Sequence, residues 1–340
     1  MIAPQDQFVH DVVAAFGKAP VRGIAPLGGT ACPKFAVDTP AGRFVVRVRA
    51  EEFSPEPFVR FDHEAMTRLA GAGLPVPEPQ VARDGRTWVG REGRIVELLS
   101  WKDGDAYVDV DFDRIAGVGR FLGRFHAVFS EGAPEGKEGF VREDHPDMLL
   151  PIIEGLRPLA KDAAQREGLA YVESQLDRVR NELDAGLYER LPAAVIHGDI
   201  HHGNLRFEGA DVSAVYDFDY MSRQARARDL CDAVMFFGST RGEPLDFDDI
   251  RSLTQPFFPD RKRTAALLEG YQETTPLGEL DLLGLRLLIR SQWVQIRLRG
   301  SRKIPAAERV AFVTDRFETV IDWLDRESEP FFAAFALGKS

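Results

Sequence analysis

The sequence predicts an α+β protein with two parts, a smaller sheet-containing part over about residues 1–100 and a larger, mainly helical part over about residues 101–340. Three observations lead to this prediction. Runs rich in β-forming residues, separated by turn residues, are concentrated in the first hundred positions. Apolar residues recur at helical spacing through most of the remaining chain. The length of 340 residues also suits two domains or lobes, at roughly 150 residues each.

The N-terminal part is expected to begin with a short amphipathic helix, because Phe8, Val12 and Phe16 recur at helical spacing. A second helix is expected over 58–72, where glycines and then prolines follow its last turn. Two β-rich runs precede this second helix and two follow it. These runs lie at 35–38, 44–48, 87–89 and 94–99. The irregular stretch 101–105 is expected to link the two parts.

The C-terminal part contains two clear helical stripes of apolar residues, from Ile115 to Phe129 and from Val172 to Leu183. Helical patterns return from Asp248 to the end of the chain. Residues 130–146 are rich in glycine, proline and charge, so we expect a surface loop there.

One pair of short strands interrupts the helical part. Residues 205–207 and 212–216 alternate well enough for strands, and Glu208 to Asp211 supply a turn. The sequence His-Gly-Asp-Ile-His-His-Gly-Asn (197–204) lies directly before this hairpin, and Asp-Phe-Asp (217–219) lies directly after it. Because a hairpin brings the outer ends of its strands together, we expect polar residues of both segments to meet.

Three of these residues have the chemistry that phosphoryl transfer needs. Asn204 and Asp217 offer oxygen ligands, which Mg²⁺ prefers, and phosphate oxygens and water would complete its coordination. Asp199 would accept the proton of an attacking hydroxyl group. Phosphoryl transfer depends mainly on positioning and on neutralising charge. The alternative, that the three are only capping and turn residues around a hairpin, is disfavoured by the joint pattern.

The run HGDIHHGN followed by VYDFD resembles the aminoglycoside phosphotransferase and choline kinase superfamily. Relatives in this superfamily include homoserine kinases, methylthioribose kinases and bacterial stress-response kinases. The resemblance implies a two-lobed protein-kinase-like fold, with an antiparallel sheet and one important helix in the N-lobe and a mainly helical C-lobe. It also implies ATP and Mg²⁺ as cofactors.

The resemblance implies a role for each residue around the hairpin. Asp199 takes the position of the catalytic base, and His201 takes that of a residue that touches the transferred phosphate. Asn204 and Asp217 take the metal positions. Asp219 stands where protein kinases have glycine, and it either joins the metal shell or braces the loop.

The resemblance also implies nucleotide-binding positions in the N-lobe. A glycine turn covers the phosphates, a basic strand residue contacts them, a helical glutamate pairs with that basic residue, and a hinge backbone holds adenine. The residues at these positions are Gly28, Gly29 and Thr30 for the turn, Arg47 for the basic residue, Glu64 for its partner, and Glu97, Leu98 and Leu99 for the hinge.

The chain departs from the family pattern in the N-lobe. Arg47 stands where many relatives carry lysine, and an arginine presents a different hydrogen-bonding geometry to phosphate. Arg49 lies on the same face of the strand, so alternation leaves open which of the two faces the nucleotide, although Arg47 is preferred. The glycine turn continues with Ala31-Cys32-Pro33, where relatives often carry a polar residue.

Several polar residues near the motif are interpreted as structural. His197 and His126 are expected to form structural hydrogen bonds. Asp229 is expected to anchor the catalytic loop or to cap the following helix. Cys231 is expected to be buried and inert.

The composition argues against other classes of protein. The net charge of −11 disfavours nucleic acid and anionic lipid as main partners. Two cysteines, Cys32 and Cys231, argue against a disulfide framework or a zinc site. Neither a signal peptide nor a membrane-spanning segment is expected. We therefore expect a cytoplasmic location. The oligomeric state stays open.

The acceptor of the phosphoryl group is expected to be a small hydroxyl-bearing metabolite, such as homoserine, a related amino alcohol or a sugar. An aminoglycoside, a protein serine or threonine, and a nucleotide-binding pseudokinase are the alternatives. The intact set of Asp199, Asn204 and Asp217 argues against the pseudokinase. A basic stretch is interpreted either as a solvated helical face or as a site for an anionic substrate, whereas an acidic stretch would suit a polycation. The basic residues are Arg286, Arg290, Arg297, Arg299, Arg302 and Lys303, and the acidic ones are Glu243, Asp246, Asp248 and Asp249.

Overall fold

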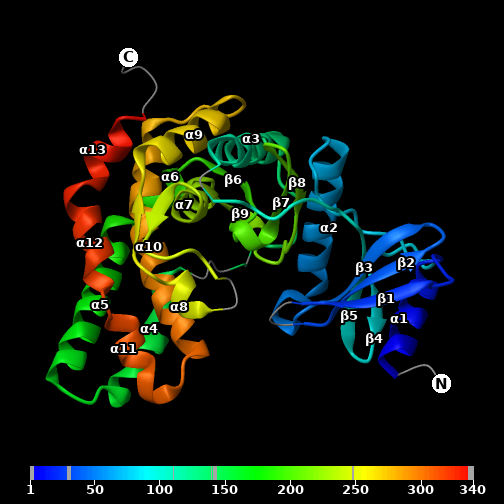
Figure 1. Ribbon diagram of the computed structural model, residues 1–340, viewed down its shortest axis with the longest axis horizontal. Helices are drawn as coiled ribbons and strands as arrows, with labels where there is room; N and C mark the ends of the chain where they lie inside the picture. Colours follow the sequence, from blue (N-terminus) through cyan, green and yellow to red (C-terminus); the bar gives the residue numbers. More distant parts are fainter. Residues whose placement is uncertain are drawn as a thin grey trace.

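The computed structural model describes residues 4–28, 32–109, 111–138, 140, 144–246 and 249–335. It has two lobes, a small one built on a sheet and a larger helical one (Figure 1). The predicted α+β fold class is therefore confirmed, with an antiparallel sheet and helices in the N-terminal lobe and helices dominating the C-terminal lobe. No helix in the described part of the chain is long and apolar enough to span a bilayer.

The N-lobe is a five-stranded antiparallel sheet with the strand order β1-β2-β3-β5-β4. Its strands are β1 (Gly23–Leu27), β2 (Lys34–Thr39), β3 (Gly42–Val48), β4 (Val89–Arg91) and β5 (Arg94–Ser100). The four predicted strands are all present, and β1 is an additional edge strand. Side chains alternate along β3 and β5, so Val46 and Leu98 face one side of the sheet while Arg47 and Glu97 face the other.

Two helices cover the two faces of this sheet. Helix α1 (Pro4–Ala15) packs its apolar stripe on the face that carries Val46 and Leu98, and together they form a separate small core. Helix α2 (Glu56–Gly71) stands between the sheet and the C-lobe (Figure 1). The apolar side chains of α2 belong to the large core of the C-lobe. Helix α2 therefore connects the two lobes through its packing.

The C-lobe consists of helices around three two-stranded sheets. The helices are α3 (Phe112–Val128), α4 (Pro146–Leu156), α5 (Ala163–Glu182), α6 (Ala185–Arg190), α7 (Ala227–Phe236), α8 (Ile250–Leu253), α9 (Arg261–Gln272), α10 (Glu279–Gly300), α11 (Arg309–Thr314), α12 (Phe317–Arg326) and α13 (Ser328–Ala333). The strand pairs are β6 (Ala193–Ile196) with β9 (Ser222–Ala225), β7 (Leu205–Glu208) with β8 (Asp211–Val215), and β10 (Ser239–Arg241) with β11 (Phe257–Pro259). The predicted hairpin is the β7–β8 pair.

Glycine residues allow α3 and α9 to pack backbone against backbone. A Cβ atom at Gly119 would lie 2.0 Å from the carbonyl oxygen of Leu267, and one at Gly270 would lie 2.3 Å from that of Ala116. Real Cβ atoms do not approach so closely, so the two helices lie at this separation only because glycine occupies both positions.

The prediction of a surface loop over 130–146 is wrong at Lys137. The ammonium group of Lys137 is buried and lies 2.6 Å from Oδ1 of Asp62 on α2. It also donates to the main-chain oxygens of Asp219 (2.9 Å) and Met221 (2.8 Å). Because Asp62 receives Arg49 at 2.6 Å as well, one carboxylate of α2 joins the sheet of the N-lobe to the segment that follows β8. Loop composition gave no sign of this buried ion pair.

We expect Lys137→Met to lower the free energy of unfolding by about 3–5 kcal/mol, because removing one member of a buried pair leaves unpaired polar groups behind. Urea denaturation followed by circular dichroism measures this change. The matched control is Lys303→Met, which removes an exposed ammonium group and should change stability by less than about 0.5 kcal/mol. Equal stabilities for the two variants would refute the role of Lys137 as a tie between the lobes.

Candidate active site

The β7–β8 hairpin brings the two polar segments together. Leu205 pairs with Val215, and the amide of Tyr216 donates to the main-chain oxygen of Asn204 at 2.9 Å. Asn204 and Asp217 therefore leave the same end of the hairpin. This is the juxtaposition that the sequence predicted for the motif residues.

Asp199 lies beside Asn204 in the loop that leads into the hairpin. The amide nitrogen Nδ2 of Asn204 donates to Oδ2 of Asp199 at 3.0 Å and to the main-chain oxygen of Asp199 at 2.9 Å. Because Nδ2 is engaged with Asp199, the amide oxygen of Asn204 is the atom that it can offer to a cation.

His201 forms an ion pair with the same carboxylate, with 3.4 Å between Nε2 and Oδ2 of Asp199. Burial acts to raise the pKa of Asp199, but the charge and hydrogen bond of His201, together with His197 and Asn204, outweigh it and lower the pKa to about 2. Burial acts in the opposite sense on the imidazole, yet Asp199 raises the pKa of His201 above its ordinary value. Asp199 is therefore fully ionised at neutral pH.

Asp229 holds the start of this loop in place. Its carboxylate accepts hydrogen bonds from the amides of His197 and Gly198, each at 2.8 Å. Burial disfavours the ionised carboxylate, but His126, at 3.1 Å, helps to hold the pKa of Asp229 below its ordinary value. The backbone at Gly198 has φ of +82°, and a Cβ there would lie 2.7 Å from the main-chain oxygen of Tyr220. Glycine is therefore required at this turn.

The two carboxylates after the hairpin both face Arg47. Asp217 lies 3.3 Å from Nη2 of Arg47 and has a left-handed φ of +64°, which is uncommon outside glycine and clusters at functional sites. Asp219 forms an ion pair with the same Nη2. Lys34 on β2, which lies opposite Arg47 in the sheet, places its Nζ 3.6 Å from Asp217. The sequence analysis missed Lys34, although the register of a β2–β3 hairpin would have indicated it.

The predicted pairing of Arg47 with Glu64 is wrong. Glu64 is about half exposed and pairs with Arg68 on the outer face of α2. The carboxylate of α2 that faces the sheet is Asp62, which lies 2.6 Å from Arg49. Residues two positions apart on a helix point in nearly opposite directions, so a displacement of two residues reverses the face.

Glu97 is the buried acid that binds both arginines. It lies opposite Arg47 in the sheet, with 3.2 Å between Oε2 and Nη1 of Arg47. Oε1 lies 2.6 Å from Arg49 and 3.0 Å from His63. Although burial acts to raise the pKa of Glu97, the two arginines hold it well below the ordinary value. Both arginines thus lie on the same face of the sheet, and Arg47 is the one that also contacts Asp217.

The predicted hinge at Glu97, Leu98 and Leu99 is displaced, because these residues lie inside the sheet. Leu99 is in register with Val45 of β3, and on the other side the main-chain oxygen of Leu98 accepts the amide of Gln80 at 2.8 Å. The backbone leaves the sheet only after Ser100. The connection to the C-lobe is therefore 101–105, where the amides of Trp101 and Asp105 donate to the main-chain oxygens of Arg43 (3.2 Å) and Phe207 (2.8 Å).

The predicted phosphate-covering turn is described only at its first residue. Among the described residues, none places a heavy atom within 4 Å of a Cβ built at Gly28. Gly29 and Thr30 lie outside the described residues.

The donor set around the hairpin suits a divalent cation. No group of three or more His, Cys, Asp or Glu side chains is positioned to hold a metal within the described ranges. However, Asn204 and Asp217 leave the same end of the β7–β8 hairpin, Asp219 follows two residues later, and their oxygen donors are of the kind that Mg²⁺ prefers. Oδ1 of Asp219 is buried and accepts no hydrogen bond from the described part of the chain, although Arg49 lies 3.4 Å away. These residues therefore fit the cation that the resemblance implies.

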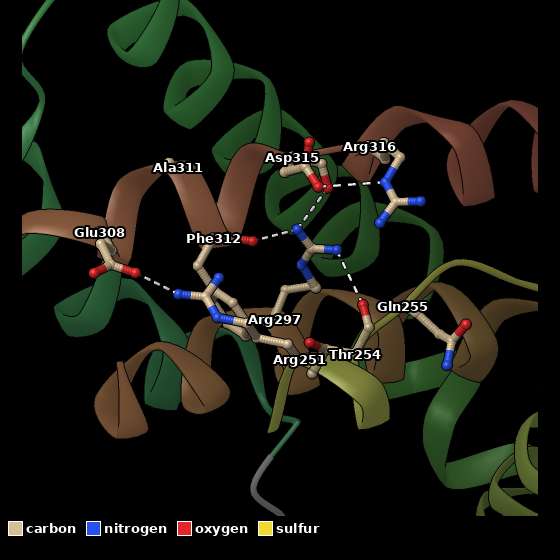
Figure 2. A pocket seen from close by; sticks show the side chains of 9 residues that line it. All are labelled: Arg251, Thr254, Gln255, Arg297, Glu308, Ala311, Phe312, Asp315 and Arg316. Carbon is tan, nitrogen blue, oxygen red and sulfur yellow. Dashed lines mark hydrogen bonds and ion pairs between the residues drawn. The ribbon is translucent and has the colours of Figure 1, made fainter. Parts of the chain in front are cut away.

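Two hollows in the C-lobe lie apart from this site. One, of about 360 Å³, is lined by residues of α8, α10 and α11 (Figure 2). In its wall, Arg297 donates to main-chain oxygens at the ends of helices, at 3.0 Å for Thr254 and 2.6 Å for Asp315. Arg297 therefore ties helix ends together, and the basic stretch of the sequence is not uniformly a solvated face. The other hollow, of about 370 Å³, lies beside the ends of α3 and α9. The predicted site residues line neither hollow.

Comparisons with known proteins show the family of the chain. The family model of the phosphotransferase enzyme family matches residues 23–267, well over half of the chain. The homoserine kinase of Rhodopseudomonas palustris (strain TIE-1) is 26% identical over 272 residues, which is 79% of this chain and 75% of that protein. The homoserine kinase of Rhizobium johnstonii is 29% identical over 231 residues, which is 66% of this chain and 63% of that protein.

Solved structures show the same fold at low sequence identity. The amicoumacin kinase hAmiN in complex with AMP-PNP, Ca²⁺ and Ami superimposes with a TM-score of 0.68 at 13% identity, covering 98% of both chains. A microcompartment-associated aminopropanol kinase also gives a TM-score of 0.68, at 16% identity, covering 95% of this chain and 98% of that one. The chain therefore belongs to the phosphotransferase enzyme family, and it is a small-molecule kinase.

Proposed function

We propose that this kinase uses ATP and Mg²⁺ to phosphorylate the hydroxyl group of a small amino alcohol such as homoserine. The observation that carries the proposal is the constellation at the hairpin, where ionised Asp199 is bonded to Asn204 and His201, and Asp217 and Asp219 face Arg47. A base and a set of oxygen donors thus lie in one loop and next to one hairpin, and Arg47 approaches them from the sheet of the N-lobe. The experiment that tests the proposal is an ATP-coupled assay with L-homoserine and other hydroxylated acceptors.

Asp199 would orient the acceptor hydroxyl and accept its proton. With a pKa of about 2, Asp199 is a weak base. A weak base is sufficient because phosphoryl transfer passes through a loose transition state, in which positioning and charge stabilisation matter more than proton removal. Asn204 fixes the carboxylate through its amide. His201 accepts the amide of Gly203 at Nδ1 (3.0 Å) and directs Nε2 at Asp199, so it would hold this carboxylate in orientation.

Asn204, Asp217 and Asp219 would hold the divalent cation. When bound, this cation neutralises charge on the β- and γ-phosphates during transfer. Arg47 and Lys34 now contact the carboxylate of Asp217, and each can turn from that carboxylate to a phosphate oxygen. The backbone at 101–105 would bind adenine, because it is the segment that leaves the sheet.

The acceptor class rests on the relatives together with the chemistry of the site. The curated relatives are named homoserine kinases, and a structural neighbour is named an aminopropanol kinase. Both names denote a molecule with an amino group and a hydroxyl group. An aminoglycoside is the second candidate, because aminoglycoside phosphotransferases share the fold.

We expect Asp199→Asn to lower kcat by at least ~100-fold with little change in the affinity for ATP, because the amide cannot accept the hydroxyl proton. The coupled assay with L-homoserine and equilibrium binding of an ATP analogue measure the two effects. The control is Asp177→Asn on the exposed face of α5, which should leave kcat unchanged. Full activity of Asp199→Asn would remove the carboxylate from the mechanism.

We expect the Asp199–His201 pair to shape the pH dependence. Because the pKa of Asp199 is lowered in the folded protein, Asp199 contributes to the free energy of unfolding. This contribution is complete above the pKa of the unfolded chain, about 3.9, and is lost as the pH falls toward 2. The raised pKa of His201 means that its share is complete below its unfolded value of about 6.5 and is lost as the pH rises through the folded-state pKa. Activity should therefore decline on the alkaline side.

The variant His201→Gln separates these effects. Loss of the imidazolium charge should raise the pKa of Asp199, so the acidic limb of the kcat/KM profile should move to higher pH, and the alkaline decline should disappear. Profiles of kcat/KM measured between pH 4 and 10 check both changes. Identical profiles for the wild type and His201→Gln would contradict the assigned ion pair.

A further inference from the structure

Two buried polar side chains meet between α7 and α10. Asp232 is 2% exposed and Gln292 is 6% exposed. Oδ1 of Asp232 accepts two hydrogen bonds, from Nη1 of Arg228 at 2.5 Å and from Nε2 of Gln292 at 3.0 Å. The other two oxygens of this pair, Oδ2 of Asp232 and Oε1 of Gln292, accept no hydrogen bond from any residue that the structure describes.

This pair lies beside the catalytic loop. Phe236, at the end of α7, places its ring 5.8 Å from the ring of His201, and its main-chain oxygen lies 2.6 Å from Nε2 of His202. Asp232 precedes Phe236 by four residues and therefore lies on the same face of the helix. The negative charges of Asp199 and Asp229 also act on Asp232. Asp232 thus lies on the helix whose C-terminal end contacts the catalytic loop, and the charge of Asp199 acts on it.

The unpaired atoms define the chemistry of the missing partner. Both are oxygen acceptors, so the partner is a hydrogen-bond donor. The orientation of the Gln292 amide is fixed, because the opposite orientation would place its oxygen against Oδ1 of Asp232. A buried unpaired acceptor costs about 1–3 kcal/mol, and more when it is charged, so such atoms in a native protein call for an explanation.

The charge of the pair favours a cation over a neutral donor. Arg228 is the only ion-pair partner of Asp232 among the described residues, and the charge of Asp144 also acts on Arg228. Burial raises the pKa of Asp232 to about 7 in spite of Arg228, so the carboxyl is partly protonated near neutral pH, and an incoming cation would favour its ionised form. A water molecule would satisfy the hydrogen bonds but not the charge, whereas an ammonium group supplies both.

We propose that Asp232 and Gln292 bind the ammonium group of the acceptor and thereby make this kinase select amino alcohols over neutral alcohols and sugars. The inference rests on the proposed function, since it assigns the acceptor side of the same site. It names two residues that the motif does not include, and their role is specificity rather than phosphoryl transfer.

The test compares matched acceptors in which one group replaces the ammonium group. The pairs are 1-amino-2-propanol with 1,2-propanediol and L-homoserine with 2,4-dihydroxybutanoate. For at least one pair, the wild-type kinase should show a kcat/KM at least ~30-fold higher for the amino member. Asp232→Asn, which keeps the shape and removes the charge, should lower kcat/KM for that amino member by at least ~30-fold, mainly through KM, as expected when one partner of a buried charge pair is removed. The value for the neutral member should change by less than about threefold.

The controls separate this inference from the proposed function. Asp177→Asn should preserve the selectivity, and Asp199→Asn should abolish phosphorylation of both members of a pair. If the wild-type kinase phosphorylates an amino alcohol and Asp232→Asn retains its selectivity, the ammonium site is refuted while the kinase assignment stands. If the wild-type kinase phosphorylates no member of either pair, the proposed acceptor class fails first.

If Asp232→Asn does not fold, the variant Gln292→Met provides the test, because it removes the second unpaired oxygen. Gln292→Met should reduce the selectivity at least ~5-fold, and unchanged selectivity would overturn the inference.

Discussion

The active site is organised by a cluster of buried charges at the joint between the lobes. Glu97 binds Arg47 and Arg49, Arg49 binds Asp62, and Asp62 binds Lys137. Desolvation offsets much of the attraction within such a cluster, so its presence is a weak argument for stability. The cluster has a larger effect on geometry than on stability, because leaving any one of these buried charges without its partner would cost free energy. The sheet, α2 and the segment after β8 are therefore held in one arrangement, with the arginines directed at the carboxylates of the Asp-Phe-Asp motif.

The same cluster prepares the site for a triphosphate. Arg47 contacts both Asp217 and Asp219, and Lys34 contacts Asp217 from the neighbouring strand. These two carboxylates are the ones proposed to bind the divalent cation. Arg47 and Lys34 therefore lie where the metal ion and the phosphates of ATP would bind. Exchange of partners within a preformed set of charges needs little reorganisation, which is the condition for effective electrostatic stabilisation of phosphoryl transfer. Arginine at this position, rather than lysine, permits contacts with Glu97, Asp217 and Asp219 at once.

Local patterns predicted the elements better than they predicted the contacts between them. Turn residues and alternation sufficed for the β7–β8 hairpin and for the meeting of Asn204 with Asp217, because a hairpin fixes both of its ends. The prediction that Glu64 pairs with Arg47 was wrong because motif spacing does not specify which face of a helix a residue lies on. Asp62, two residues earlier, lies on the opposite face of α2 and is the carboxylate that faces the sheet. Lys137 was missed because a loop rich in glycine and charge normally lies in solvent, and only its tertiary pairing with Asp62 buries it. The hinge was displaced because the end of β5 depends on the neighbouring segment that pairs with it, which residues 97–99 do not reveal.

Two carboxylates near the catalytic loop have opposite electrostatic environments, and this difference separates their roles. Asp199 is surrounded by groups that favour its ionised form, so its pKa is about 2, whereas burial raises that of Asp232 to about 7. A carboxylate that is already ionised, with one oxygen held by Asn204 and His201, is suited to holding a hydroxyl group in a fixed orientation. A buried carboxylate with one unpaired oxygen gains most from an incoming cation, since binding supplies both a charge and the missing hydrogen bond. An acceptor with a hydroxyl group and an ammonium group satisfies both environments at once, and a neutral sugar satisfies only the first.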